Sequence, residues 1–132
     1  MPISTQLRDN IIVSVWHGEI VLADMVQMLK ALEDFEVQLP VAPDRLTDMS
    51  GAQVLRFLSG DMVSMAQSRQ QAKLKNQVKS AIIATSPEQY GLARMFQAYN
   101  QNPDIHIMIF RERRPAYEWL GIELNSSDQP EA

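Results

Sequence analysis

The sequence predicts a single-domain α/β protein in which helices cover one mixed β-sheet. The chain has 132 residues, a length that fits one domain with one sizeable core. Short β-branched runs alternate with segments of helical periodicity, a pattern that is typical of parallel strands joined by helices. An N-terminal hairpin adds an antiparallel strand. The expected order of elements is therefore ββαβαβαβα.

The N-terminal hairpin is predicted over residues 3–18. Asp9 and Asn10 supply turn residues that tolerate a positive φ. Residues 11–16 have the β-branched and aromatic composition of a buried strand, which we expect to end at Gly18. Apolar residues then recur at steps of three and four over residues 19–35, and this spacing predicts an amphipathic helix.

The middle of the chain continues the alternation. Two prolines precede a short strand over residues 45–50, which we expect to end near Asp48. Ser59 is the expected N-cap of a helix over residues 60–75. A further strand is predicted over residues 80–84.

The next helix has a clear start. Ser86 is the expected N-cap, Pro87 occupies the first helical position and Gln89 completes a capping box. The helix is predicted to run to about residue 100. Gly91 near its start weakens the helix relative to alanine, so we expect a neighbouring backbone to approach closely there.

The last elements are a strand and a short helix. Isoleucines alternate with other residues over residues 104–110 and predict the strand. Pro115 opens the short helix and Gly121 closes it. We expect residues 1–122 to form the domain and residues 123–132 to form a polar, disordered tail.

The composition excludes several classes of function. The chain has no cysteine, so disulfides, thiolate metal sites and cysteine nucleophiles are excluded. A net charge of −4 gives no bulk electrostatic support to a nucleic-acid partner. No signal peptide and no transmembrane segment are predicted, so the expected location is cytoplasmic. The two histidines lack metal-binding spacing, and glycine-rich phosphate loops are absent; we expect no metal, no cofactor and no enzymatic reaction.

Two motifs carry a family resemblance. The stretch YGLARMFQ at residues 90–97 and the WLG at residues 119–121 resemble the SpoIIAA-like bacterial family, and the resemblance extends over roughly residues 3–122. It implies the fold that STAS domains of anti-sigma-factor antagonists share with lipid-binding CRAL-TRIO domains. Those antagonists carry a phosphorylatable serine in a sequence like Asp-Ser-Ser-Gly. The matching stretch here retains Ser59 but has Leu58 at the phosphoacceptor position, so we expect no kinase-controlled switch.

Five residues are candidates for ligand or partner contacts. Asp48 and Ser50 end a predicted strand, where open α/β sheets often bind ligands, and Ser59 begins the helix that follows. Tyr90 and Arg94 lie four residues apart on one flank of a helix. Arg94 has two interpretations. We favour a structural arginine held by a backbone carbonyl or an acid near Asp48; the alternative is an anchor for a carboxylate or phosphate.

The sequence supports two hypotheses about function. The first is a non-enzymatic regulatory or protein-interaction module, which rests on the resemblance and on the absence of a catalytic constellation. The alternative is a carrier or sensor that binds a small apolar or amphipathic, lipid-like ligand in a cleft between helices. It rests on the eight methionines and the kinship to CRAL-TRIO domains. We also expect a homodimer, with Trp119 at its interface.

Overall fold

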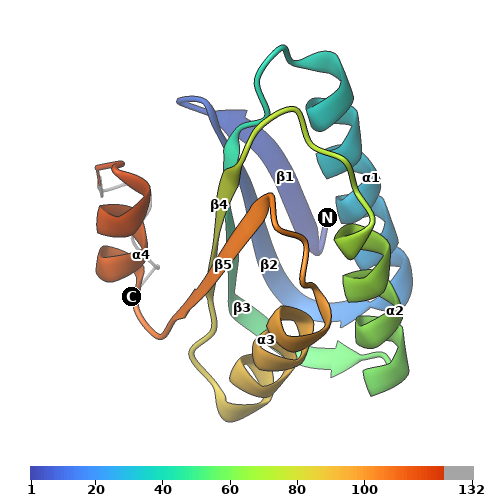
Figure 1. Cartoon of the computed structure of the whole chain (residues 1–132). Helices are drawn as coiled ribbons and strands as arrows, with labels where there is room; N and C mark the ends of the chain where they lie inside the picture. Colours follow the sequence, from blue (N-terminus) through green and yellow to red (C-terminus); the bar gives the residue numbers. More distant parts are fainter. Residues whose placement is uncertain (124–132) are drawn as a thin grey trace.

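A computed structural model describes residues 1–123, which form a five-stranded sheet and four helices (Figure 1). The elements in chain order are β1 (Ile3–Arg8), β2 (Ile11–Val21), α1 (Leu22–Gln38), β3 (Asp44–Arg56), α2 (Ser59–Gln70), β4 (Val78–Ile83), α3 (Pro87–Tyr99), β5 (Ile105–Phe110) and α4 (Arg113–Leu120). β1 pairs with β2 in the antiparallel sense, and all other neighbouring strands are parallel. The predicted class and the predicted order of elements are both confirmed.

The strands lie in the sheet in the same order as in the chain, β1-β2-β3-β4-β5. Parallel strands are joined by right-handed crossovers, and here every crossover moves the chain one strand further in the same direction. The three connecting helices therefore all lie on one face of the sheet. Figure 1 shows α1, α2 and α3 on that face and α4 on the opposite one.

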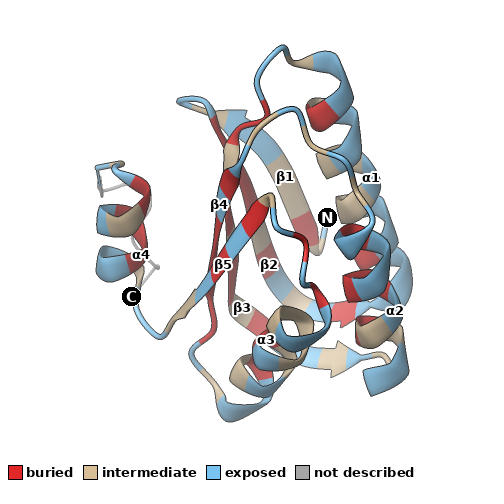
Figure 2. Cartoon of the chain, in the orientation of Figure 1, coloured by how far each residue is buried: buried red, intermediate tan, exposed pale blue. Residues whose placement is uncertain are grey.

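The sheet separates two apolar cores. The larger core lies between the sheet and the three connecting helices, and Trp16, Ile20 and Met25 are buried in it. The smaller core lies under α4, where Leu46 and Tyr117 are buried. Figure 2 shows the buried residues along the strands and on the helix faces that meet the sheet. Strands buried on both faces explain the nearly continuous apolar runs in the sequence.

The local signals for the hairpin and for α3 are confirmed. Asp9 and Asn10 have φ values of 49° and 65°, the positive values that a two-residue hairpin turn requires. At the start of α3 the Ser86 hydroxyl oxygen accepts a hydrogen bond of 3.1 Å from the Gln89 amide. The Gln89 side-chain oxygen accepts in turn from the Ser86 amide at 3.3 Å.

The predicted ends of β2 and β3 are wrong. β2 does not end at Gly18 but continues to Val21, and β3 continues past Asp48 to Arg56. The two strands stay paired because register shifts, which are typical of β-bulges, absorb the irregular residues. One shift lies beside Gly18, which has a φ of 66°. The extended part of each strand pairs with the extended part of the other. Neither segment of the sequence shows this pairing by itself.

The predicted boundaries of three helices also differ. The helix predicted over residues 19–35 is α1, which spans Leu22–Gln38 because β2 continues to Val21. Ser59 is the first residue of α2 rather than its N-cap; Leu58 occupies the cap, and its amide donates to the Asp61 carboxylate at 2.9 Å. α2 ends at Gln70 rather than Lys75 because the Asn102 side-chain amide binds the carbonyl oxygens of Arg69 and Ala72 at 3.0 and 2.7 Å.

The last helix begins at Arg113, two residues before Pro115. Gly121 closes it, as predicted, with a φ of 75°. The predicted disorder of the tail concerns residues 124–132, which lie outside the described residues.

Candidate functional site

Three charged side chains meet beneath α1 and α2. Glu36 comes from α1, Arg45 from β3 and Arg69 from α2, and their exposed fractions are 8%, 4% and 2%. Glu36 Oε2 accepts from Arg45 Nη1 at 2.6 Å and from Arg69 Nη2 at 2.5 Å, while Oε1 accepts from Arg69 Nη1 at 3.0 Å. We call these three residues the buried charge cluster.

The buried charge cluster carries a net charge of +1. Burial alone would raise the pKa of Glu36, but the hydrogen bonds and charges of Arg69 and Arg45 outweigh burial, so this pKa is lowered. Burial lowers the pKa of Arg45, against the opposing effect of Glu36. An arginine nevertheless stays protonated inside proteins. Two buried guanidinium groups therefore share one buried carboxylate.

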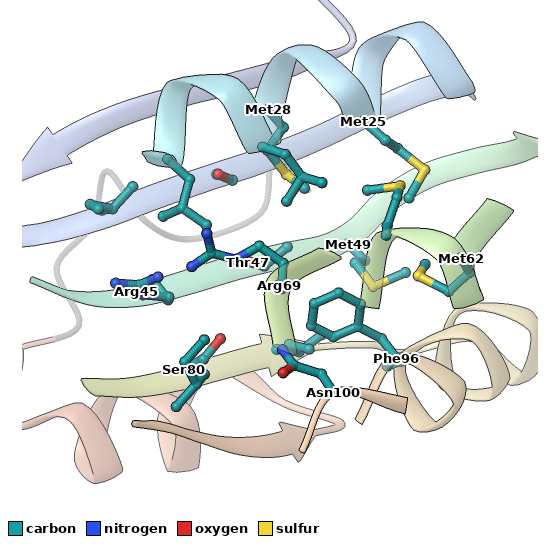
Figure 3. A pocket seen from close by; sticks show the side chains of 18 of the residues that line it. Met25, Met28, Arg45, Thr47, Met49, Met62, Arg69, Ser80, Phe96 and Asn100 are labelled. Atoms are coloured by element: carbon teal, nitrogen blue, oxygen red, sulfur yellow. The ribbon is translucent and has the colours of Figure 1, made fainter. Parts of the chain in front are cut away.

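A cavity of about 70 Å³ lies beside this cluster, between the sheet and the connecting helices. Its lining has a polar end and a methionine-rich end. In Figure 3, Arg45 and Ser80 lie at one end of the cavity and Met25, Met49 and Met62 at the other. The polar side chains of the lining are those of Ser14, Arg45, Thr47, Arg69, Ser80 and Asn100. The methionines of the lining are Met25, Met28, Met49, Met62 and Met65.

Strand geometry explains how polar residues reach this cavity. Alternate residues of a strand face the same side, and Arg45, Thr47 and Met49 of β3 all line the cavity. The sheet register places Ser80 of β4 opposite Arg45, and Ser14 of β2 opposite Thr47. A polar row therefore crosses the inner face of the three central strands. An arginine at an alternating position of a doubly buried strand was the signal in the sequence that could have revealed this site.

Three buried side-chain nitrogens in the described residues have no hydrogen-bond partner. They are Trp16 Nε1, Arg45 Nε and Asn100 Nδ2, and all three residues line the cavity. Leaving a buried polar group unsatisfied costs about 1–3 kcal/mol each. All three groups are donors, so they require an acceptor.

A groove of about 410 Å³ lies on the surface between α1 and α2. Leu22 and Val26 of α1 form part of it and are 38% and 54% exposed. Leu29 and Met65 line both this groove and the internal cavity. The side chains of these two residues therefore stand between the cavity and the surface. We call this hollow the α1–α2 groove.

The arrangement of helices and strands is found in a solved protein. A crystal structure of an uncharacterised DUF3478-family protein from Shewanella loihica PV-4, described as having a SpoIIAA-like fold, superposes with a TM-score of 0.58. The superposition covers 89% of this chain and 91% of that one, at 19% sequence identity. The chain has a SpoIIAA-like fold. No protein-family model matches the sequence, and neither does any curated protein.

Within the SpoIIAA-like fold, Asp48 and Ser50 lie together but outside the cavity. The Ser50 amide and hydroxyl donate to Asp48 Oδ1 at 2.9 and 2.6 Å. Arg113 of α4 donates to Asp48 Oδ2 at 2.8 Å, which fixes α4 against the opposite face of the sheet. Ser59 is exposed at the start of α2 and does not line the cavity. Asp48 thus links Ser50 to α4, and a ligand or partner contact at these two residues stays a prediction.

The favoured partner of Arg94 is wrong. Arg94 is exposed, and its Nη1 donates to the Tyr90 hydroxyl at 3.3 Å. Its guanidinium carbon lies 5.8 Å from the centre of the Tyr90 ring, and that of Arg111 lies 4.7 Å from the same ring. The acid near the strand end, Asp48, is paired with Arg113 instead. A helix flank that points to solvent places Arg94 beyond the reach of that acid.

Replacing Arg94 should therefore leave stability almost unchanged. We expect Arg94→Ala to change the free energy of unfolding by no more than about 0.5 kcal/mol, as for surface changes away from buried partners. Urea denaturation of the variant beside the wild type measures this difference. A loss of about 1–3 kcal/mol, the range for a charge-assisted hydrogen bond, would show that Arg94 has a structural partner.

Trp119, the predicted interface residue, packs within the chain. Its ring contacts His106 edge to face with centroids 5.5 Å apart, and it lies 5.8 Å from the Phe110 ring. Lys79 Nζ lies 5.4 Å from the Trp119 ring centre. These contacts leave Trp119 half-buried. The homodimer stays a prediction, and Trp119 already has neighbours within its own chain.

Two further properties concern the described residues only. No group of three or more His, Cys, Asp or Glu side chains among residues 1–123 is arranged to hold a metal ion. None of the four described helices combines the length and the hydropathy that crossing a membrane requires.

Proposed function

We propose that this protein is a non-enzymatic binding module that holds a small amphipathic molecule in the cavity beneath α1, α2 and α3. The observation that carries the proposal is the coincidence of three unpartnered donors with a methionine-rich lining. A ligand with an acceptor group would satisfy donors that the protein leaves unpaired. Flexible methionine side chains adapt to ligands of different shape.

The size of the cavity limits the ligand. At about 70 Å³ it is smaller than the roughly 150 Å³ apolar cavities that accept benzene. A ligand larger than a few heavy atoms therefore requires the lining to repack. Leu29 and Met65 are the side chains that must move to join the cavity with the α1–α2 groove.

The chemistry of the lining supports binding over catalysis. No histidine, aspartate or glutamate is among the described residues that line the cavity, so the lining offers no side-chain general base of these types. The nearby Glu36 accepts hydrogen bonds from two arginines, which hold it in the ionised state. We therefore propose that any bound molecule is held and released unchanged.

Filling the cavity should abolish binding. Ala93 of α3 lines the cavity and is 1% exposed, so Ala93→Leu would occupy the space a ligand needs. Ala98, on the same helix, is exposed, and Ala98→Leu is the matched control. Calorimetric titration with hexanoate, 1-hexanol and hexylammonium measures binding to each variant, and circular dichroism confirms that each is folded.

We expect saturable binding of at least one six-carbon compound to the wild type and to Ala98→Leu, and none to folded Ala93→Leu. Native mass spectrometry of freshly purified protein would show a copurified ligand in the same two proteins. Failure of all three compounds to bind the wild type, up to their solubility limits, would refute the ligand proposal.

The exposed α1–α2 groove favours a second candidate, the regulatory or protein-interaction module. Here Leu22 and Val26 would contact a protein partner directly. The two candidates predict opposite results in a genetic complementation assay. Val26→Asp should abolish the activity of an interaction module while Ala93→Leu preserves it, whereas a ligand-binding module should lose activity with Ala93→Leu.

A further inference from the structure

We infer that the cavity binds a monoanionic amphiphile, and that its head group is a carboxylate. This inference rests on the ligand-binding function proposed above. It follows from three properties of the cavity: the sign of the buried charge, the type of the unpaired groups and their position relative to the methionines.

The sign of the buried charge favours an anion. Arg45 and Arg69 both line the cavity, and they share a single carboxylate, that of Glu36. Within the buried charge cluster one positive charge is therefore in excess; the further acid that acts on Arg45 is its half-buried neighbour Asp44, which does not line the cavity. Burying an uncompensated charge costs several kcal/mol even after the surrounding protein relaxes. An anionic ligand beside Arg45 would remove that penalty, whereas a cationic ligand would increase it.

The unpaired groups favour a head that only accepts hydrogen bonds. Trp16 Nε1, Arg45 Nε and Asn100 Nδ2 each donate and cannot accept. An alcohol would bring an additional donor into the site, and an ammonium group would bring only donors. A carboxylate has two oxygens and about four lone-pair positions, so it accepts hydrogen bonds and brings no donor of its own. Those from Arg45 would be charge-assisted and therefore strong.

The amount of charge distinguishes a carboxylate from a phosphate. The buried charge cluster has one unit of excess positive charge, which a carboxylate neutralises. A phosphate monoester carries about −1.5 to −2 charges at neutral pH and would leave a buried negative excess. A phosphate head also has three terminal oxygens to accommodate in a cavity of about 70 Å³.

The position of the polar groups orients the ligand. Arg45 and Ser80 lie at one end of the cavity and Met25, Met49 and Met62 at the other, with Asn100 between them (Figure 3). A carboxylate head would lie at the Arg45 end. The apolar chain would then extend among the methionines.

The test compares three head groups on one chain length. Hexanoate, 1-hexanol and hexylammonium share the same apolar chain, so differences in affinity report the head group. We expect the wild type to bind hexanoate at least tenfold more tightly than 1-hexanol, and hexylammonium not to bind. Equal or tighter binding of 1-hexanol or hexylammonium would overturn the inference and leave the ligand-binding function intact. If none of the three binds, the proposed function itself fails.

The variant Asn100→Asp tests where in the cavity the head group binds. This variant keeps the shape of Asn100 and the oxygen that accepts from the Asn102 amide at 3.3 Å, but it replaces the unpaired donor with an anionic oxygen. We expect hexanoate affinity to fall at least tenfold and 1-hexanol affinity to change less than threefold. Gln101→Glu adds the same charge at the neighbouring exposed position and should preserve both affinities.

Equal losses for the two compounds in folded Asn100→Asp would refute the assigned position of the head. If Asn100→Asp does not fold, Trp16→Phe removes another unpaired donor and keeps an aromatic ring at that position. That variant should weaken hexanoate more than 1-hexanol. The opposite order, or no difference, would overturn the inference.

Discussion

Glu36→Ala is expected to lower the free energy of unfolding by about 3–5 kcal/mol, the loss that follows when one partner of a buried ion pair is removed. Glu36 is the carboxylate that accepts from both Arg45 and Arg69. Without it, two buried guanidinium groups face each other uncompensated. Since domains of this kind are stable by about 5–15 kcal/mol, much of the total would be lost. Urea denaturation followed by circular dichroism measures the change.

Glu33→Ala is the control, because Glu33 lies on the same helix and is exposed. We expect that variant to stay within about 0.5 kcal/mol of the wild type. A loss below about 1 kcal/mol in Glu36→Ala would contradict the account of the buried charge cluster.

The same cluster gives stability a dependence on pH. The pKa of Glu36 is lower in the folded state than its ordinary value of 4.5. Its contribution to stability is therefore complete above that value and is lost as the pH falls through the lower, folded pKa. In the Glu36→Gln variant the free energy of unfolding should depend less on pH below 4.5 than in the wild type. In the Glu33→Gln variant this dependence should be unchanged.

Gly51→Ala is expected to destabilise the fold by about 1–3 kcal/mol, the usual range for overpacking a filled site. A Cβ atom at Gly51 would lie 2.4 Å from the carbonyl oxygen of Trp16. Both groups belong to the backbones of paired strands, so the clash is relieved only if β2 and β3 separate locally. Thermal and urea denaturation of the variant measure the loss.

Gly91→Ala is the matched control and should act in the opposite direction. Nothing lies within 4 Å of a Cβ at Gly91, the fifth residue of α3, so the close approach expected there is absent. Alanine at that position should stabilise the helix by about 0.5–1 kcal/mol. Equal stability of Gly51→Ala and the wild type would show that the two strands adjust freely.

Local signals account for what could be predicted from the sequence. Asp9-Asn10 and the capping box at Ser86 act within a few residues, so the hairpin and the start of α3 are readable in the chain itself. The ends of β2 and β3 depend on pairing between distant segments, and no local pattern reports them.

The sequence does not reveal the buried charge cluster, for a different reason. Glu36 follows Glu33 and Asp34 on a helix and reads as one of several solvent-facing acids. Only the packing of α1 against β3 and α2 gives it partners. The sequence favours Asp48 because it ends a predicted strand, and open α/β sheets often bind ligands at strand ends where the strand order reverses. Here the order never reverses, so no such crevice forms at that strand end.

The consecutive order of the strands also affects how the chain can assemble during synthesis. Each strand pairs with the strand that precedes it in the sequence, so every new pairing closes a short loop of chain. The entropy lost on closing a loop rises with its length, and this topology keeps that loss small at each step. Domains emerge from the ribosome N-terminus first. The hairpin of β1 and β2 can therefore serve as the edge to which each later helix and strand is added in turn.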